Sequence, residues 1–392
     1  IIIKDVTAVF GGTIPFAPEW WTYASGSDKF IGGEASLVTC GTLTTDAAGT
    51  FDITATFGGN AANYDFTFEK GKLTVEKAQI TPPVFANGTA GFDGTVKKHE
   101  ITALPAGIQS VTYTYEKDGV NYGSNGVREA GVYTVTARFV ADGNHVAPAD
   151  VTATFEITAL EIDLLNSGVK LENVLNAVYN GYSHKILSSG SADGITGVTY
   201  SYVDNASGAA VAEGSVINAG TYTVTATFAA DGNHTFKNGV NTLTATLKIN
   251  KASLTVKAND LTVIYGDAAK TNGYTISGLA AGDTENSIGL KVTVSINGYT
   301  PFTTNVGAVN GGVTLTAAIT SQNYELQAPV AGNVTVIPRE ISADEVKWFL
   351  EKTDAIPAEK LEYTHDGETH LPYAKAVIGG ITGEFIISGA QK

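Results

Sequence analysis

The 392-residue sequence predicts an all-β fold made of similar modules in tandem. The first observation is a stretch at 131–145, GVYTVTARFVADGNH, which returns at 220–234 as GTYTVTATFAADGNH. Looser copies begin at positions 49 and 311. In every copy apolar residues alternate with Thr or other polar residues, which is the period of a half-buried β-strand. A strand that recurs at domain-sized intervals indicates a series of similar β modules.

This recurring strand, here named the anchor strand, gives the size of the modules. The third residues of its copies are Phe51, Tyr133, Tyr222 and Val313, which lie 82, 89 and 91 residues apart. Such a length is sufficient for one small sandwich core. The inward face is expected to consist of Phe51, Ile53, Ala55 and Phe57, then Tyr133, Val135, Ala137 and Phe139, then Tyr222, Val224, Ala226 and Phe228, then Val313, Leu315, Ala317 and Ile319.

Composition is the second observation. Thr, Val, Gly, Tyr and Phe are abundant, as is typical of all-β proteins. The formal charge of −15 makes nucleic acid and anionic membranes poor partners. No run of about 20 apolar residues is present, so this segment predicts no membrane span. Cys40 is the only cysteine, and its Thr-rich strand favours a small core residue over a nucleophile.

The copies divide the chain into four modules and part of a fifth. The expected bounds are 1–77, 78–160, 161–250, 251–338 and 339–392. The joints contain no Ser/Gly linker, which predicts limited bending and an extended rod. Residues 164–178 are the best helix candidate, with a loop-and-strand insertion as the alternative. A hairpin turn is expected at 69–72.

The last module is incomplete. It restarts the plan of the second and third modules, but the sequence stops before an anchor strand. We expect either that the natural protein continues or that another chain supplies the missing strand. The chain also begins within a strand, so we expect an internal or processed piece of something longer.

A second motif surrounds the anchor strand of modules two and three. Residues 129–135 and 218–224 share the pattern acid-or-Asn, x, Gly, x, Tyr, x, Val, with the glycines Gly131 and Gly220 before the tyrosines Tyr133 and Tyr222. This pattern is similar to the tyrosine corner at strand F of immunoglobulin-like sandwiches. The two hydroxyls are therefore expected to bond to the backbone at the corner. Phe51 and Val313 have no hydroxyl, so modules one and four should lack that bond.

Several longer motifs resemble one family. AGTYTVTATF, NYDFTFEKGKLTVEKA, VTVIPREI, and YGD followed by YTISGLAAGD resemble the mostly-bacterial immunoglobulin-like repeats of the MBG and YDG families. The resemblance implies tandem sandwiches in extracellular, secreted or surface-anchored bacterial proteins, commonly as stalk segments of adhesin-like molecules. It brings no catalytic residue and no cofactor. A β-grasp-like module is the alternative for modules one and four.

The histidines predict structure rather than chemistry. His145 and His234 occupy the same position in two repeats, so they are expected to lie too far apart to share a metal or a triad. Asp142-Gly143-Asn144 and its copy at 231–233 are typical of tight turns. Calcium at the joints is the less favoured alternative. No metal, cofactor or catalytic residue is therefore expected, and the protein is expected not to be an enzyme.

Aromatic residues in module one give the best candidate binding site. Trp20, Trp21 and Tyr23, with Phe16 nearby, could form a platform that stacks on sugar rings. The alternative is that they pack in the core and at the joint. The chain is thus expected to be a structural stalk segment. One alternative is an array that binds a glycan or a host or bacterial surface protein through module one. Another is a fibre subunit that self-associates through 339–392.

Overall fold

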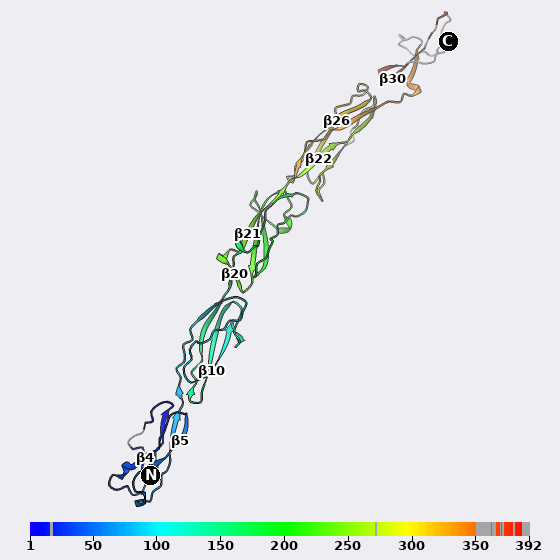
Figure 1. Cartoon of the computed structure of the whole chain (residues 1–392). Coiled ribbons are helices and arrows are strands. Elements are labelled where there is room, and N and C mark those ends of the chain that lie inside the picture. The colour runs from blue at the N-terminus through cyan, green and yellow to red at the C-terminus, as the bar shows by residue number, and fades with distance from the viewer. Residues whose placement is uncertain are drawn as a thin grey trace. The chain divides into compact units, whose positions relative to one another are not determined.

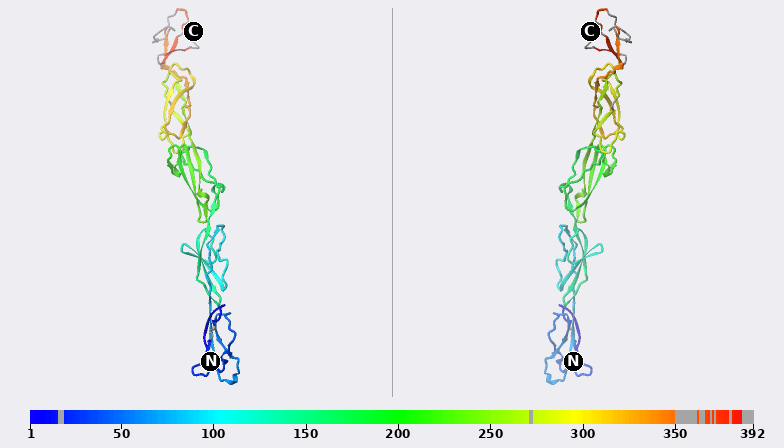
Figure 2. Two further views of the ribbon diagram at one scale, coloured as in Figure 1. Left: turned by 90° about the vertical axis from the view of Figure 1, so that its left-hand side faces the viewer. Right: turned by 90° about the vertical axis from the view of Figure 1, so that its right-hand side faces the viewer.

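The computed structural model describes residues 1–15, 19–270, 273–349, 362, 366–368, 370, 372–378 and 381–385. Across these residues the chain forms β-strands and short 3-10 turns, as the ribbon views show (Figures 1 and 2). None of the helices among them is long and apolar enough to cross a membrane. The all-β class predicted from the alternating pattern is therefore confirmed.

The chain divides into two compact units, and the division crosses the third expected module. Unit 1 contains Ile1–Gly168, Ser191–Gly197 and Phe228–Asn241. Unit 2 contains Val169–Gly190, Val198–Thr227 and Thr242–Lys392. Each contact described below lies within one of these units.

Module one forms three small sheets in unit 1. Its elements are β1 (Ile2–Ile3), β2 (Val6–Val9), β3 (Trp21–Thr22), η1 (Glu34–Leu37), β4 (Val38–Cys40), β5 (Gly49–Ile53), β6 (Ala55–Phe57), η2 (Ala61–Asn63) and β7 (Gly71–Glu76). The main sheet has the order β2-β7-β5, with β2 parallel and β5 antiparallel to β7. Strands β1 and β3 pair with each other, as do β4 and β6.

Two predictions for module one are wrong. The anchor strand breaks at Thr54 into β5 and β6, which belong to different sheets, and Phe51 is 42% exposed rather than inward. The expected hairpin at 69–72 is also absent, because β7 begins at Gly71 and pairs with β2 and β5. Gly71 is needed for close approach instead, since a Cβ there would lie 2.8 Å from the carbonyl oxygen of Ile3.

Module two forms a five-stranded sheet in unit 1. Its strands are β8 (Ala78–Gln79), β9 (Gly88–Gly91), β10 (Ile108–Lys117), β11 (Val120–Gly123), β12 (Gly131–Ala141), β13 (His145–Val146) and β14 (Val151–Thr158). The sheet order is β11-β10-β12-β14-β9, and β8 pairs in parallel with β13. The predicted inward face of the anchor strand β12 is confirmed, because its four apolar side chains are at most 5% exposed.

Module three repeats this plan. Its elements are β15 (Leu160–Ile162), η3 (Leu164–Asn166), β16 (Val174–Val178), β17 (Ile195–Asp204), β18 (Ala210–Val211), η4 (Glu213–Ser215), β19 (Gly220–Ala230), β20 (His234–Phe236), η5 (Lys237–Gly239) and β21 (Thr242–Asn250). The sheet order β16-β21-β19-β17-β18 matches that of module two. Residues 164–178 form one 3-10 turn, a loop and β16, so the loop-and-strand alternative is correct. Gly168 has a φ of +86°, which ends the turn.

Module four lies in unit 2 and follows the plan of module one. Its strands are β22 (Ala252–Ala258), β23 (Leu261–Ile264), β24 (Tyr274–Ser277), β25 (Lys291–Ile296), β26 (Gly307–Ala318), β27 (Tyr324–Leu326) and β28 (Gly332–Ile337). They form two sheets with the orders β24-β22-β27 and β23-β28-β26-β25. No α-helix packs on these sheets or on those of module one within the described residues. The β-grasp alternative, which needs such a helix, is therefore not supported.

The last piece of the chain contributes a small sheet. It contains η6 (Ala343–Glu345), β29 (Val346–Phe349), β30 (Tyr373–Ile378) and β31 (Ile381–Phe385). These strands form an antiparallel sheet in the order β29-β30-β31. Part of this piece, including residues 350–361 and 386–392, lies outside the described residues.

Candidate functional site

The most regular feature of the structure is one hydrogen bond at each of three joints between modules. In each case the side-chain oxygen of an Asn accepts a hydrogen bond from the backbone N–H of an Ala in the preceding module. This Ala directly precedes the glycine at which the anchor strand begins. The bonds are Ala48 to Asn144 at 2.9 Å, Ala130 to Asn233 at 2.8 Å and Ala219 to Asn323 at 2.9 Å. These asparagines are named the joint asparagines.

The same asparagines also hold the first strand of their own module. Their backbone carbonyls accept the N–H of its first residue: Ala78 to Asn144, Leu160 to Asn233 and Ala252 to Asn323, at 2.9 to 3.0 Å. Each joint asparagine therefore connects two points of the chain, its own opening strand and the corner of the preceding module. Its N–H is fixed in turn by a side chain two residues earlier, which is Asp142, Asp231 or Ser321.

An aromatic pair lies beside each of these hydrogen bonds. The ring before a turn glycine of one module meets the ring that follows the joint asparagine of the next. The pairs are edge-on, with centroid distances of 5.1 Å for Phe10 and His145, 5.5 Å for Phe92 and His234, and 5.4 Å for Tyr179 and Tyr324. Such pairs contribute about 0.5–1.5 kcal/mol beyond the area that they bury.

The repeated histidines are thus joint residues, each in its own environment. His145 donates from Nδ1 to Asp142 at 2.7 Å, and His234 makes the same bond to Asp231. This hydrogen bond is the main reason that the pKa of each Asp carboxyl lies below its usual value. The His145 ring also lies against Gly107, where a Cβ would be only 2.5 Å from Nδ1. No group of three potential metal ligands occurs in the described part of the chain.

The third joint contains a partly buried polar cluster. Asp283 accepts hydrogen bonds from the hydroxyls of Tyr179 at 2.8 Å and Tyr324 at 2.5 Å. Burial, and then the hydrogen bond to Asp283, raise the pKa of Tyr324 to about 12. One apolar cluster includes Tyr222 of module three together with Leu254 of module four, so these modules share a core.

The tyrosine corners are present in modules two and three. Tyr133 donates to the carbonyl oxygen of Glu129 at 2.7 Å, and Tyr222 donates to that of Asn218 at 2.8 Å. Gly131 has a φ of +144°, a conformation that favours glycine. Gly220 instead allows a Cβ, which would lie 3.5 Å from the Tyr222 ring.

The first residue of the corner pattern has a second role that the sequence did not reveal. The side-chain amide of Asn233 donates to the Glu129 carboxylate, and that of Asn323 donates to the Asn218 side chain. The corner and the joint are therefore one structure. Module one has Ala47 at the corresponding position, so its joint lacks a side-chain acceptor there.

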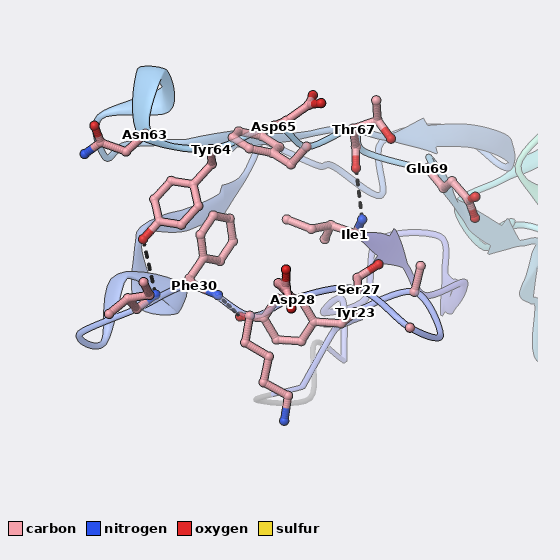
Figure 3. Close-up of a pocket in the computed structure, with 15 residues that line it drawn as sticks. Ile1, Tyr23, Ser27, Asp28, Phe30, Asn63, Tyr64, Asp65, Thr67 and Glu69 are labelled. Carbon is pink, nitrogen blue, oxygen red and sulfur yellow. Dashed lines mark hydrogen bonds between the residues drawn. The ribbon is translucent and has the colours of Figure 1, made fainter.

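The residues of the predicted aromatic site in module one lie in different environments. Trp20 and Trp21 are half-buried and pack against the module core. Tyr23 lies edge-on to Trp21 at 5.1 Å, and its hydroxyl accepts the N–H of Phe30 at 3.1 Å. Phe16 lies outside the described residues. Tyr23 and Phe30 line a cavity of about 880 Å³ whose other wall is the segment 63–69 (Figure 3).

The sequence of module one matches a known domain family. Residues 1–74 match the MBG domain (YGX type). The predicted resemblance to the MBG family is thereby confirmed for residues 1–74. The match ends two residues before the end of β7, shortly before the expected boundary at residue 77.

The other comparisons found only distant similarity. No curated protein matches the chain. Mouse cadherin-23 EC22-24 has 14% identity over 65% of this chain and 97% of its own, with a TM-score of 0.24. Drosophila N-cadherin EC1-3 has 12% identity over 65% and 100%, with a TM-score of 0.22. Bacteroides ovatus SGBP-B, solved with a mixed-linkage heptasaccharide, has 14% identity over 71% and 80%, with a TM-score of 0.17. Scores this low carry no argument about function.

Proposed function

We propose that this chain is a non-enzymatic structural stalk segment of a bacterial cell-surface or secreted adhesin-like protein. The observation that carries the proposal is the joint, which has the same parts three times: an asparagine bonded to the preceding corner, an aromatic pair and a paired opening strand. A stalk needs such joints, because it keeps its length only if motion between neighbouring modules is restricted.

The chemistry of the joints supports this function. The Asn233 side chain accepts from Ala130 and donates to Glu129, so two directional bonds fix one amide. An opening strand that pairs within its own module leaves almost no free linker between the two. The shared core at the third joint adds apolar contact to the polar bonds. Bending at a joint would break all of these interactions together.

Composition and family support an extracellular location. The MBG match covers residues 1–74. The sequence motifs of the other modules resemble related bacterial surface repeats. The net charge of −15 favours solubility of a long exposed chain. The single cysteine leaves stability to packing and hydrogen bonds rather than to internal disulfides.

The two alternative functions stay predictions. Binding of a glycan or a surface protein through module one rests on Tyr23, because the two tryptophans contribute to the core. Assembly of fibres through 339–392 rests on residues of which many lie outside the described part of the chain.

The stalk function is tested by small-angle scattering of the whole chain. The expected result is a particle whose maximum dimension greatly exceeds that of a compact 392-residue protein. Changing all three joint asparagines to Ala should shorten the average dimension and broaden its distribution. Asn125→Ala, at an exposed position in module two, is the matched control and should change nothing. A compact particle, or a triple variant identical to the parent, contradicts the proposal.

A further inference from the structure

The sheets that contain the anchor strand differ at one edge. In modules two and three these sheets have five strands, and an outermost strand pairs antiparallel with the strand beside the anchor strand: β11 with β10, and β18 with β17. In module four the anchor strand β26 lies between β28 and β25, and within the described residues no strand follows β25. The place that β11 and β18 occupy is therefore open in module four.

Strand β25 is hydrogen-bonded along one edge. It contains six residues, which pair with β26 from Lys291 opposite Ala318 to Ile296 opposite Val313. Within the described part of the chain, no backbone hydrogen bond joins it to a residue outside β26. Its other edge thus presents unpaired N–H and C=O groups, which form a template for another strand.

This edge lacks the features that usually keep strand edges from pairing. The strand contains no proline, its pairing with β26 has no register shift, and Lys291 at its first position is its only charged residue. Val292, Val294 and Ile296 pack against the module core but are only partly buried. A further strand beside them would remove more of their apolar surface from water.

The local charge permits a second copy of the chain to approach this edge. The whole chain contains 39 acidic residues and has a net charge of −15, which favours separate copies. Residues 286–324, which include β25 and most of β26, contain no Asp or Glu, and Lys291 is their only charged residue. These two strands therefore bring no negative charge to a contact between copies.

The side chains of β25 also match a second copy of the same strand. With a two-fold axis at Thr293, antiparallel pairing places Thr293 opposite its own copy, Val292 opposite Val294, and Lys291 opposite Ser295. Apolar residues then meet on the core face, polar residues meet on the outer face, and no like charges are opposed. Such a contact uses the same surface in both copies, as a closed dimer requires.

We propose that β25 is a self-association edge, at which two copies of this chain pair as antiparallel strands and join their module-four sheets into one. The inference goes beyond the stalk function, which depends on the joints and not on this edge. A contact between two single strands buries little surface. The association should therefore be weak and depend on protein concentration.

Analytical ultracentrifugation of the whole chain tests the association. The parent protein should pass from monomer to dimer as its concentration rises. Thr293→Lys places two ammonium groups opposite each other at the axis, so it should raise the dissociation constant at least tenfold. The matched control is Thr316→Lys, because Thr316 is also exposed and pairs with Thr293, but lies one strand away from the edge. This variant should dimerise like the parent.

Oxidation of single-cysteine variants tests the register. In a Cys40→Ser background, Thr293→Cys should give at least tenfold more disulfide-linked dimer than Thr316→Cys. The two Thr316 positions would lie three strand spacings apart, about 14 Å, which is too far for a disulfide. Equal cross-linking of the two variants overturns the proposal.

Two other outcomes also overturn it. One is a chain that stays monomeric at every concentration, in which case the edge would accept only a strand of a different protein. The other is dimerisation that Thr293→Lys leaves unchanged, which would place the contact elsewhere in the chain, such as at 339–392.

Discussion

The backbone N–H of Ala130 donates to the side-chain oxygen of Asn233 at 2.8 Å, although the two residues are 103 positions apart in sequence. The bond joins the corner of module two to the turn between β19 and β20 of module three. It recurs with separations of 96 and 104 residues at the two other joints. This relationship makes the joint a structure with defined parts, each of which can be removed singly.

Asn233→Ala should lower the stability of the joined modules by about 1 kcal/mol, because the partly buried N–H of Ala130 and the Glu129 carboxylate lose their partner. Asn144→Ala should cost less, since that joint lacks the side-chain acceptor. Both losses of stability can be measured by chemical denaturation of the whole chain, followed by hydrogen exchange at amides that belong to single modules. Equal losses for the two variants, or no loss for Asn233→Ala, would contradict this account.

Tyr222→Phe removes the hydroxyl that donates to Asn218 and should destabilise module three by about 1 kcal/mol. The ring itself stays in the core, so packing is preserved. Tyr182→Phe is the matched control, because that side chain is 65% exposed. Denaturant midpoints of the two variants should differ clearly. A midpoint for Tyr222→Phe equal to that of the control would show that the corner bond is dispensable.

Stability should fall in acid because joint carboxyls have pKa values below their usual range. Hydrogen bonds from His145 and His234 are the main cause for Asp142 and Asp231. A depressed folded-state pKa contributes stability that is complete above the unfolded value, near 4, and is lost as pH falls through the folded value. The free energy of unfolding should thus be nearly level from pH 5 to 7 and decline below pH 4.

The matched variant for this acid response is Asp142→Asn with Asp231→Asn. It keeps an oxygen acceptor for the N–H groups of Asn144 and Asn233 but removes the titrating groups. Its decline in acid should be shallower than that of the parent protein. Parallel curves would mean that other carboxyls, such as Asp93 beside Lys97, dominate the acid response.

Trp21→Ala should lower the stability of module one by about 2 kcal/mol, because the half-buried ring packs on the core and on Tyr23. A glycan array tests the alternative function with the same protein. Val84→Ala is a control for loss of an apolar side chain, since Val84 is 87% exposed. Specific glycan binding that Trp21→Ala removes without loss of stability would favour the binding function.

Repetition in the sequence predicted the parts of the fold that lie within a module. Tyr133, Val135 and Ala137 alternate with polar residues, and all three are buried as expected. The same pattern failed in module one, because pairing with β7 and β4 decides the face of Phe51 and breaks the strand. The alternation of apolar and polar residues indicates which face of a strand is buried. It does not show with which neighbouring strand a segment pairs.

The joints could be predicted only in part. Repetition indicated that His145 is structural, and the structure shows where it acts. The role of Glu129 was hidden, since its partner Asn233 belongs to the next module and no local motif links them.

The separation between Ala130 and Asn233 also has a consequence in time. At a synthesis rate of 5–20 residues per second, the partner of each corner emerges about 5–20 s after the corner itself. In modules one to three, the corner N–H therefore lacks its asparagine partner until most of the next module has been synthesised. The chain matures in sequence order, and each newly completed module secures the one made before it.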